Sequence, residues 1–116
     1  MRFGMMYEQG DIVLLPVPFS DLTNRKQRPV LVISSNSYNE VTDDIVVVAI
    51  NSQLRNLDYS VVIESKDLKE GKLKVASAIR ADKVYTLFKD IVRKKFGQVN
   101  TEVMEDVRKK VNELIK

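Results

Sequence analysis

Arg80 and Asp82 are the residues of this chain whose types and spacing best suit chemistry, because they stand two positions apart in a segment that reads as a strand. Side chains at positions i and i+2 of a strand point to the same face, roughly 6–7 Å apart. A carboxylate can act as a base, and a guanidinium can neutralise charge on a phosphorane. One scissile phosphate, or the 2′-hydroxyl beside it, can therefore meet both groups. The alternative is an ordinary surface ion pair.

Arg28 is a second candidate, and it comes directly before Pro29 at the start of an apolar run. Proline disfavours the helical conformation of the residue before it, so we expect Arg28 to be extended at the mouth of a strand. A permanently charged guanidinium held in a fixed place suits a phosphate ligand. The alternative is a solvated loop arginine. Arg25 and Lys26 add positive charge to the same polar loop.

Three polar residues, Asn51, Ser52 and Gln53, follow the longest apolar run of the chain, residues 45–50. Short polar side chains at a strand exit can donate hydrogen bonds to phosphate oxygens or to base edges. The alternative is plain turn chemistry, since Asn and Ser favour turns for their own reasons.

The composition limits which groups could carry out catalysis. The 116 residues include no cysteine and no histidine, which excludes disulfides, thiolate zinc sites and an imidazole base. Any catalysis must therefore use Asp, Glu, Arg, Lys, Tyr, Ser or Thr. The net charge of +3 permits a nucleic acid or an acidic protein as partner.

Length and hydropathy predict a single domain over residues 1–116, located in the cytoplasm. The chain has the usual size of one domain, and the lack of cysteine fits a reducing compartment. The longest apolar run is far shorter than the ~20 residues of a membrane helix, and the N-terminal segment does not resemble a signal peptide. We therefore expect no membrane association.

The elements that would position the candidate residues are mostly strands. Apolar and β-branched runs predict strands over residues 11–15, 30–33, 45–50, 59–63 and 75–80, the last continuing over 84–87. The polar segment 66–72 contains Gly71 and is expected to be a loop. Residues 88–96 fit either a strand or a helix, with Gly97 ending the element.

One helix is predicted over residues 102–115, capped by Asn100 or Thr101. Its apolar residues recur at helical spacing and form one stripe for core or dimer packing: Val103, Met104, Val107, Val111, Leu114 and Ile115. Many short strands followed by one C-terminal helix predict a mainly β fold, a small barrel with the helix laid against it.

The order of these motifs resembles the MazF/PemK toxin family of type II toxin–antitoxin systems. The resembling residues run through almost the whole chain: Gly10-Asp11, Arg28-Pro29-Val30-Leu31-Val32-Ile33, Ala49-Ile50-Asn51-Ser52-Gln53, Ser77-x-Ile79-Arg80-x-Asp82-Lys83 and Thr86. No single motif is specific, whereas the ordered set is. The resemblance implies an SH3-like β-barrel of the CcdB/MazF/PemK type, a homodimer, and an acidic cognate antitoxin as partner.

The resemblance also implies a metal-independent endoribonuclease that needs no cofactor and cleaves single-stranded RNA, leaving a 2′,3′-cyclic phosphate. The implied catalytic residues are Arg28 and Arg80, which stabilise the phosphorane, Asp82 as the base, and Ser52, which hydrogen-bonds a non-bridging oxygen. The implied RNA contacts are Arg25, Lys26, Asn51, Gln53 and Ser77.

The chain departs from the family pattern at two places. Threonine is usual at the position of Asn51, and an amide cannot reproduce a hydroxyl that donates and accepts through one atom. The loop before Arg28 lacks both a Gly-x-Glu-type sequence and the histidine of the PemK branch. A non-catalytic SH3-like module that binds RNA or protein therefore stays open. A gyrase poison of the CcdB type is disfavoured, because the C-terminal tail has no tryptophan.

Overall fold

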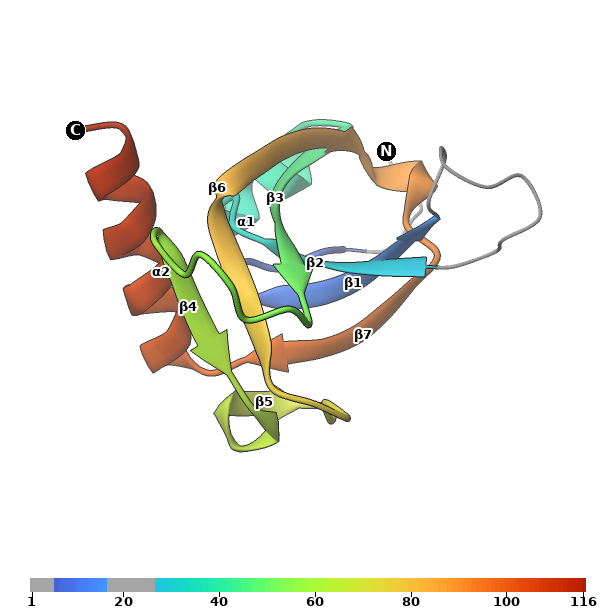
Figure 1. Cartoon of the computed structure of the whole chain (residues 1–116). Helices are drawn as coiled ribbons and strands as arrows, with labels where there is room; N and C mark the ends of the chain where they lie inside the picture. The colour runs from blue at the N-terminus through green and yellow to red at the C-terminus, as the bar shows by residue number, and fades with distance from the viewer. Residues whose placement is uncertain (1–5, 17–26) are drawn as a thin grey trace.

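The structure, a computed structural model, describes residues 6–16 and 27–116, which form one antiparallel sheet of seven strands and two helices (Figure 1). The strands are β1 (Asp11–Pro16), β2 (Gln27–Val32), β3 (Asp44–Asn51), β4 (Ser60–Ile63), β5 (Leu68–Glu70), β6 (Ser77–Phe88) and β7 (Lys94–Val99). The helices are α1 (Asn36–Val41) and α2 (Thr101–Leu114), with 3-10 turns η1 (Ser65–Asp67) and η2 (Lys89–Ile91). The strand order is β4-β6-β3-β2-β1-β7-β5. The sheet curls into a half-barrel, which confirms the mainly β, SH3-like prediction.

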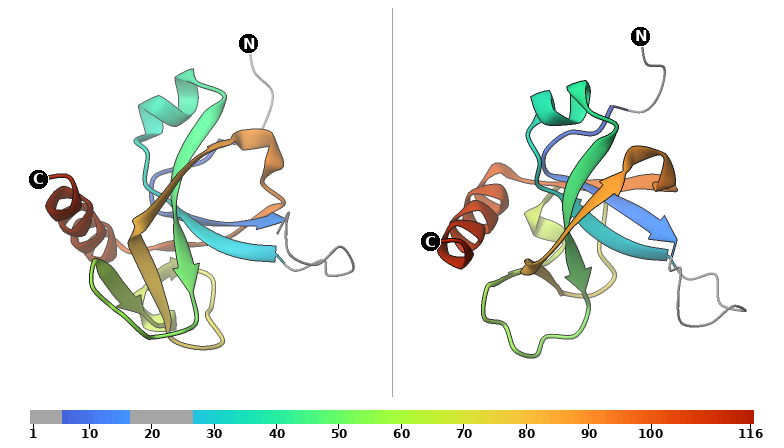
Figure 2. Two further views of the ribbon diagram at one scale, coloured as in Figure 1. Left: turned by 45° about the horizontal axis from the view of Figure 1, so that its top comes forward. Right: turned by 90° about the horizontal axis from the view of Figure 1, so that it is seen from above.

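The two faces of the curled sheet bury separate hydrophobic clusters. Neighbouring residues of one strand feed opposite faces, as with Ile12 and Val13, or Val47 and Val48, and all four are fully buried. The larger cluster lies between the sheet and α2, which runs along one side of the half-barrel (Figure 2). The strand predicted over residues 45–50 is therefore confirmed, and it is buried on both faces.

Helix α2 begins where the sequence predicts. The Asn100 side chain caps it by accepting a hydrogen bond from the Val103 N–H at 2.9 Å. Val103, Met104 and Val107 are buried against the sheet, whereas Leu114 and Ile115 are exposed. Only the first part of the predicted apolar stripe therefore packs on the core. No helix in the described ranges is both long and apolar enough to cross a membrane.

The prediction of a loop over residues 66–72 is wrong. The segment contains the end of η1 and the short strand β5, which pairs with β7 at one edge of the sheet. Because β5 is mostly exposed, it lacks the apolar alternation that would have indicated a strand.

The open choice over residues 88–96 is resolved as η2 followed by β7, and Gly97 lies inside β7 rather than ending the element. The reason is a tertiary contact. A Cβ at Gly97 would lie 2.5 Å from the carbonyl oxygen of Glu70, so glycine is needed for the close approach of β5.

Helix α1 is an element that the sequence patterns did not predict. It is six residues long and is capped by Ser35, whose hydroxyl accepts from the Tyr38 N–H at 3.1 Å. Its buried residue is Asn39, whose side-chain amide donates to the carbonyls of Tyr7 and Ser34 at 3.1 Å each. The helix is held by this polar contact rather than by an apolar stripe, which is why hydrophobic periodicity gave no signal for it.

Asp11, at the start of β1, is a buried carboxylate that joins three strands. Its side chain is 1% exposed and accepts from the Glu8 backbone N–H and from the Gln98 side-chain amide, both at 2.9 Å. Lys95 Nζ lies 3.3 Å from Asp11 Oδ1 and 3.3 Å from Glu70 Oε2 on β5. Burial alone would lower the pKa of Lys95, but the two carboxylates outweigh it and raise that pKa. The network therefore couples β1, β5 and β7.

We predict that Asp11→Ala lowers the free energy of unfolding by about 3 kcal/mol, because it leaves buried donors without an acceptor and a lysine without its buried partner. Urea denaturation followed by circular dichroism measures the loss. The matched control is Glu70→Ala. Glu70 is the exposed ion-pair partner of Lys95, so its loss should cost less than about 1 kcal/mol. Equal losses in the two variants would contradict the central role of Asp11.

Stability should fall as the pH rises above about 10, partly because of Tyr7. Burial, followed by the charges of Asp90 and Asp11, raises the pKa of the Tyr7 phenol. The unfolded chain then loses this proton first, so the stabilisation present below pH ~10 is lost as the pH rises through the folded pKa. Tyr7→Phe should flatten that decline in urea titrations between about pH 9 and 11. An unchanged slope would assign the decline to other groups.

Candidate functional site

A cavity of about 260 Å³ lies where β2 begins, β3 ends and β6 begins. Its lining residues are Gln27, Arg28, Pro29, Ile50, Asn51, Ser52 and Ser77. Four predicted site residues, Arg28, Asn51, Ser52 and Ser77, therefore meet in one place although they come from three separate segments. Arg28 is the one charged residue among the described residues that line the cavity. Gln27 was not predicted, because a polar residue at the end of a polar loop carries no distinguishing signal.

Arg28 lies inside β2 rather than in the loop before it, since the strand already begins at Gln27. It pairs with Leu15 of β1, so its backbone is fixed by the ladder as well as by the proline that follows. Arg28 is therefore a strand residue rather than a loop residue, although its side chain is exposed.

Strand register places Arg28, Asn51 and Arg80 on the same face of the sheet. Val30 pairs with Ala49, and Ala49 in turn pairs with Arg80. Arg28 is two residues from Val30, and Asn51 is two residues from Ala49, so all of these side chains share one face. The two arginines come from strands on either side of β3 and are offset by two residues along the sheet, so their backbones lie roughly 12 Å apart. On β3, Ala49 lies beside Arg80, and Asn51 is level with Arg28.

The amide of Asn51 has a fixed orientation. Its Oδ1 accepts a hydrogen bond from the Gln53 backbone N–H at 2.9 Å, which is the turn chemistry considered as an alternative. The turn leaves the side-chain NH₂ group without a hydrogen-bond partner among the described residues, and Asn51 lines the cavity. Asn51 therefore has its two N–H donors available for a ligand, while its oxygen already accepts the hydrogen bond of the turn. Gln53 contributes its backbone to this turn and does not line the cavity.

Ser77 contributes differently from its neighbours. It is buried, and its hydroxyl donates to the Val75 carbonyl at 3.2 Å. Because the proton of this hydroxyl is already engaged, Ser77 offers lone pairs to the cavity. It could accept a hydrogen bond from a hydroxyl or a base amine.

Arg80 and Asp82 form a bidentate pair on β6. Arg80 Nε donates to Asp82 Oδ1 and Arg80 Nη2 donates to Oδ2, each at 3.3 Å. The side chains are 18% and 28% exposed, so both remain accessible to a ligand. The distances are long for charge-assisted hydrogen bonds, which leaves the carboxylate able to accept another donor. The pair does not line the 260 Å³ cavity but lies on the same sheet face as Arg28.

Two predicted RNA contacts, Arg25 and Lys26, lie outside the described residues. Within the described ranges, no group of three or more Asp, Glu, Cys or His residues could hold a metal ion.

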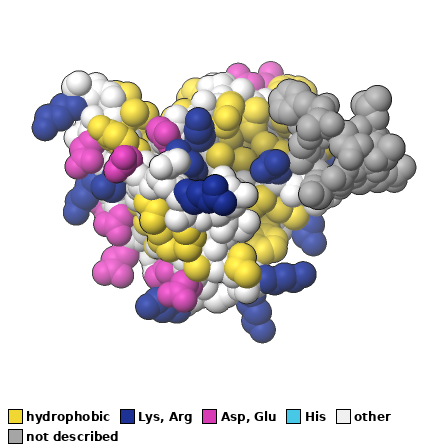
Figure 3. Space-filling view, viewed as in Figure 1, with side chains coloured by type: hydrophobic (Ala, Val, Ile, Leu, Met, Phe, Trp, Pro, Cys, Tyr) yellow, Lys and Arg dark blue, Asp and Glu magenta, His cyan; other side chains and the backbone are white. Residues whose placement is uncertain are grey.

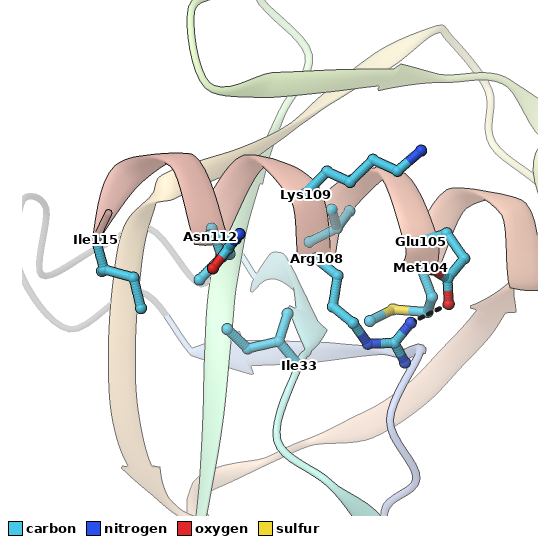
Figure 4. Close-up of a pocket in the computed structure, with 9 residues that line it drawn as sticks. Ile33, Met104, Glu105, Arg108, Lys109, Asn112 and Ile115 are labelled. Atoms are coloured by element: carbon cyan, nitrogen blue, oxygen red, sulfur yellow. Dashed lines mark hydrogen bonds and ion pairs between the residues drawn. The ribbon is translucent and has the colours of Figure 1, made fainter.

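A second cavity, of about 420 Å³, lies along α2 (Figure 4). Ile33, Met104, Val107 and Val111 give it an apolar floor, and Arg108 is paired with Glu105 at its rim. None of the predicted site residues lines it. This second cavity lies where α2 packs near Ile33, and it is separate from the cavity lined by Arg28.

Fold and site together define a small β-barrel protein with a donor-rich, cationic cavity at its strand ends. The family model for the PemK-like, MazF-like toxins of type II toxin–antitoxin systems matches residues 8–115. The chain therefore belongs to that toxin family. This membership favours the toxin hypothesis over the gyrase-poison and non-catalytic alternatives.

Solved structures agree on the fold. An endoribonuclease from a mycobacterial species aligns at a TM-score of 0.77 and 22% identity, over 98% of this chain and 95% of that one. MazF of Deinococcus radiodurans aligns at 0.75 and 23%, over 97% and 98%. A mycobacterial endoribonuclease in complex with its cognate antitoxin aligns at 0.72 and 21%, over 95% and 93%. A search of curated protein sequences finds no match.

Proposed function

We propose that this toxin is a metal-independent endoribonuclease that cleaves single-stranded RNA, mRNA included. The observation that carries the proposal is the common face of Arg28, Asn51 and Arg80, with Asp82 paired to Arg80. Two guanidinium groups and a donor amide there surround the small side chains of Ala49 and Ala78. Relatives of the same fold are described as endoribonucleases, which supports the same reaction class.

In the proposed reaction, Asp82 accepts the proton of a ribose 2′-hydroxyl, and the 2′-oxygen attacks the adjacent phosphorus. The bond from phosphorus to the 5′-oxygen of the next nucleotide breaks, and that oxygen takes a proton from water. Arg28 and Arg80 stabilise the negative charge of the phosphorane, and the Ser52 hydroxyl donates to a non-bridging oxygen. The products are a 2′,3′-cyclic phosphate and a 5′-hydroxyl. Since the nucleophile is already adjacent to phosphorus, the reaction requires no metal to generate one.

Two of the remaining RNA contacts in this proposal come from residues that line the cavity. Asn51 donates to a phosphate oxygen or a base carbonyl, and Ser77 accepts from the RNA. Gln53, Arg25 and Lys26 are further RNA contacts in this proposal. The whole chain, residues 1–116, acts as one domain.

The proposal extends to the partners of the toxin. Two copies form a C₂ homodimer, the commonest oligomer of soluble proteins, and an acidic antitoxin covers Arg28 and Arg80 in the cytoplasm. The solved MazE–MazF of Deinococcus radiodurans and the mycobacterial endoribonuclease in complex with its cognate antitoxin support a protein partner of this kind. Opposite charge predicts that antitoxin affinity falls as salt rises.

Arg28→Ala, Arg80→Ala and Asp82→Asn should each lower RNA cleavage by a factor of roughly a hundred to a thousand, about 3–4 kcal/mol of transition-state stabilisation. A gel assay of single-stranded RNA in excess EDTA measures the loss. Arg28 is exposed and Arg80 and Asp82 are part-exposed, so circular dichroism should show an intact fold.

The control is Lys109→Ala, which removes one positive charge from the exposed face of α2 and should leave cleavage unchanged. An Asp82→Asn variant that cleaves at full rate would overturn the assignment of the base. A wild-type protein that cleaves only with added magnesium would overturn the metal-independent reaction. Binding without any cleavage would favour the non-catalytic alternative.

Asn51 provides a second test of the site. Asn51→Asp keeps an acceptor for the Gln53 N–H but replaces the NH₂ donors by negative charge, so RNA affinity should fall roughly tenfold or more. Asn51→Thr should preserve or raise cleavage, because a hydroxyl can accept the turn hydrogen bond and donate to RNA through one atom. Fluorescence anisotropy with a labelled oligonucleotide compares the affinities. Wild-type affinity in Asn51→Asp would show that the amide donates nothing to RNA.

A further inference from the structure

The long strand β6 is interrupted beside the candidate site. Val84 pairs with Val48 of β3, but the next β3 residue, Ala49, pairs with Arg80. Residues 81–83 therefore have no partners on β3 and form a bulge of three residues. Bulges re-aim side chains and are frequent next to functional sites.

The bulge brings Tyr85 close to Arg80. Tyr85 pairs with Val47 and Arg80 pairs with Ala49, so the two residues occupy positions two residues apart along β3 and share its face. That separation is about 7 Å along the strand, although the residues are five positions apart in sequence. Without the bulge, an odd spacing would place their side chains on opposite faces.

Tyr85 is an exposed aromatic residue on a rigid support. Its side chain is 50% exposed, yet its backbone belongs to a ladder that continues to Phe88, and its partner Val47 is fully buried. Seen from the side of β6, hydrophobic and basic side chains gather next to one another over β3 and β6 (Figure 3). Proteins that bind single-stranded RNA stack its bases on exposed aromatic rings, and nearby basic groups hold its phosphates.

We propose that Tyr85 is a stacking platform for one RNA base, next to the nucleotide held by Arg80 and Asp82. The inference rests on the endoribonuclease function proposed above and adds a base-binding subsite to it. A base is the occupant that the surroundings favour, because the adjacent guanidinium can hold the phosphate of the same strand while the ring takes the base. Stacking tolerates any base, so this subsite contributes affinity and register rather than sequence recognition.

The test uses a mixed-sequence oligonucleotide with 2′-O-methyl sugars, which cannot supply a 2′-hydroxyl nucleophile, and a set of otherwise identical oligonucleotides that each lack one base. Fluorescence anisotropy gives their affinities for the full-length protein. Tyr85→Ala should weaken binding of the intact oligonucleotide on the order of 5- to 100-fold, whereas Tyr85→Phe should stay within about twofold of wild type. Removal of one particular base should weaken binding to wild type and have no effect on Tyr85→Ala.

The matched control is Phe88→Ala. Phe88 is 49% exposed on the same strand, but it pairs with Asp44 and so points to the other face; its loss should leave RNA affinity within about twofold of wild type. If Tyr85→Ala binds like wild type while Arg80→Ala binds weakly, the platform is overturned and the endoribonuclease proposal stands. If Tyr85→Ala weakens all oligonucleotides equally, abasic ones included, the residue does not stack on a base and the inference fails. If wild type neither binds nor cleaves RNA, the proposed function itself fails.

Discussion

The antiparallel pairing of β3 with β6 is the constraint on which the rest of the structure depends. It runs from Asp44 opposite Phe88 to Asn51 opposite Ala78, and the bulge at residues 81–83 absorbs the extra length of β6. Because β3 also pairs with β2, this ladder fixes the positions of residues from three segments relative to one another. Side chains of these strands fill the hydrophobic core on both faces of the sheet. The register also sets the distance between Arg28 and Arg80. A slip of one residue would exchange the faces and separate Arg80 from Arg28.

Two carboxylates, Asp11 and Asp82, differ in how far the protein itself uses their hydrogen-bonding capacity. Asp11 is buried and receives two hydrogen bonds and a lysine, so its accepting capacity is largely used by the protein. Asp82 is part-exposed and has Arg80 as its partner at a long distance. The buried group holds strands together, because an unpaired charge there would be costly. The part-exposed group keeps capacity for a further hydrogen-bond donor.

A site without histidine must obtain its selectivity from hydrogen-bond donors and acceptors whose directions are set in advance. Asn51 is the clearest case, since its own turn fixes which end of the amide faces the cavity. Ser77 faces the same cavity with its proton already engaged. Hydrogen-bond donors from Arg28 and Asn51 and an acceptor from Ser77 therefore line the same cavity. This arrangement suits a ligand that carries both anionic oxygens and hydroxyl groups, as RNA does.

The sequence by itself determined the mainly β fold, most of the strands, helix α2 with its Asn100 cap, and the residue pairs that could do chemistry. These follow from local rules: β-branched runs, helical spacing, and the i, i+2 geometry of Arg80 and Asp82. It could not show that β5 and α1 exist or that Gly97 lies inside a strand, because a polar edge, a buried asparagine and a close backbone approach leave no local pattern. Nor could it place Arg28 beside Asn51, or Tyr85 on the face of Arg80. Those positions depend on strand register and on one bulge, and only long-range hydrogen bonding and core packing select them.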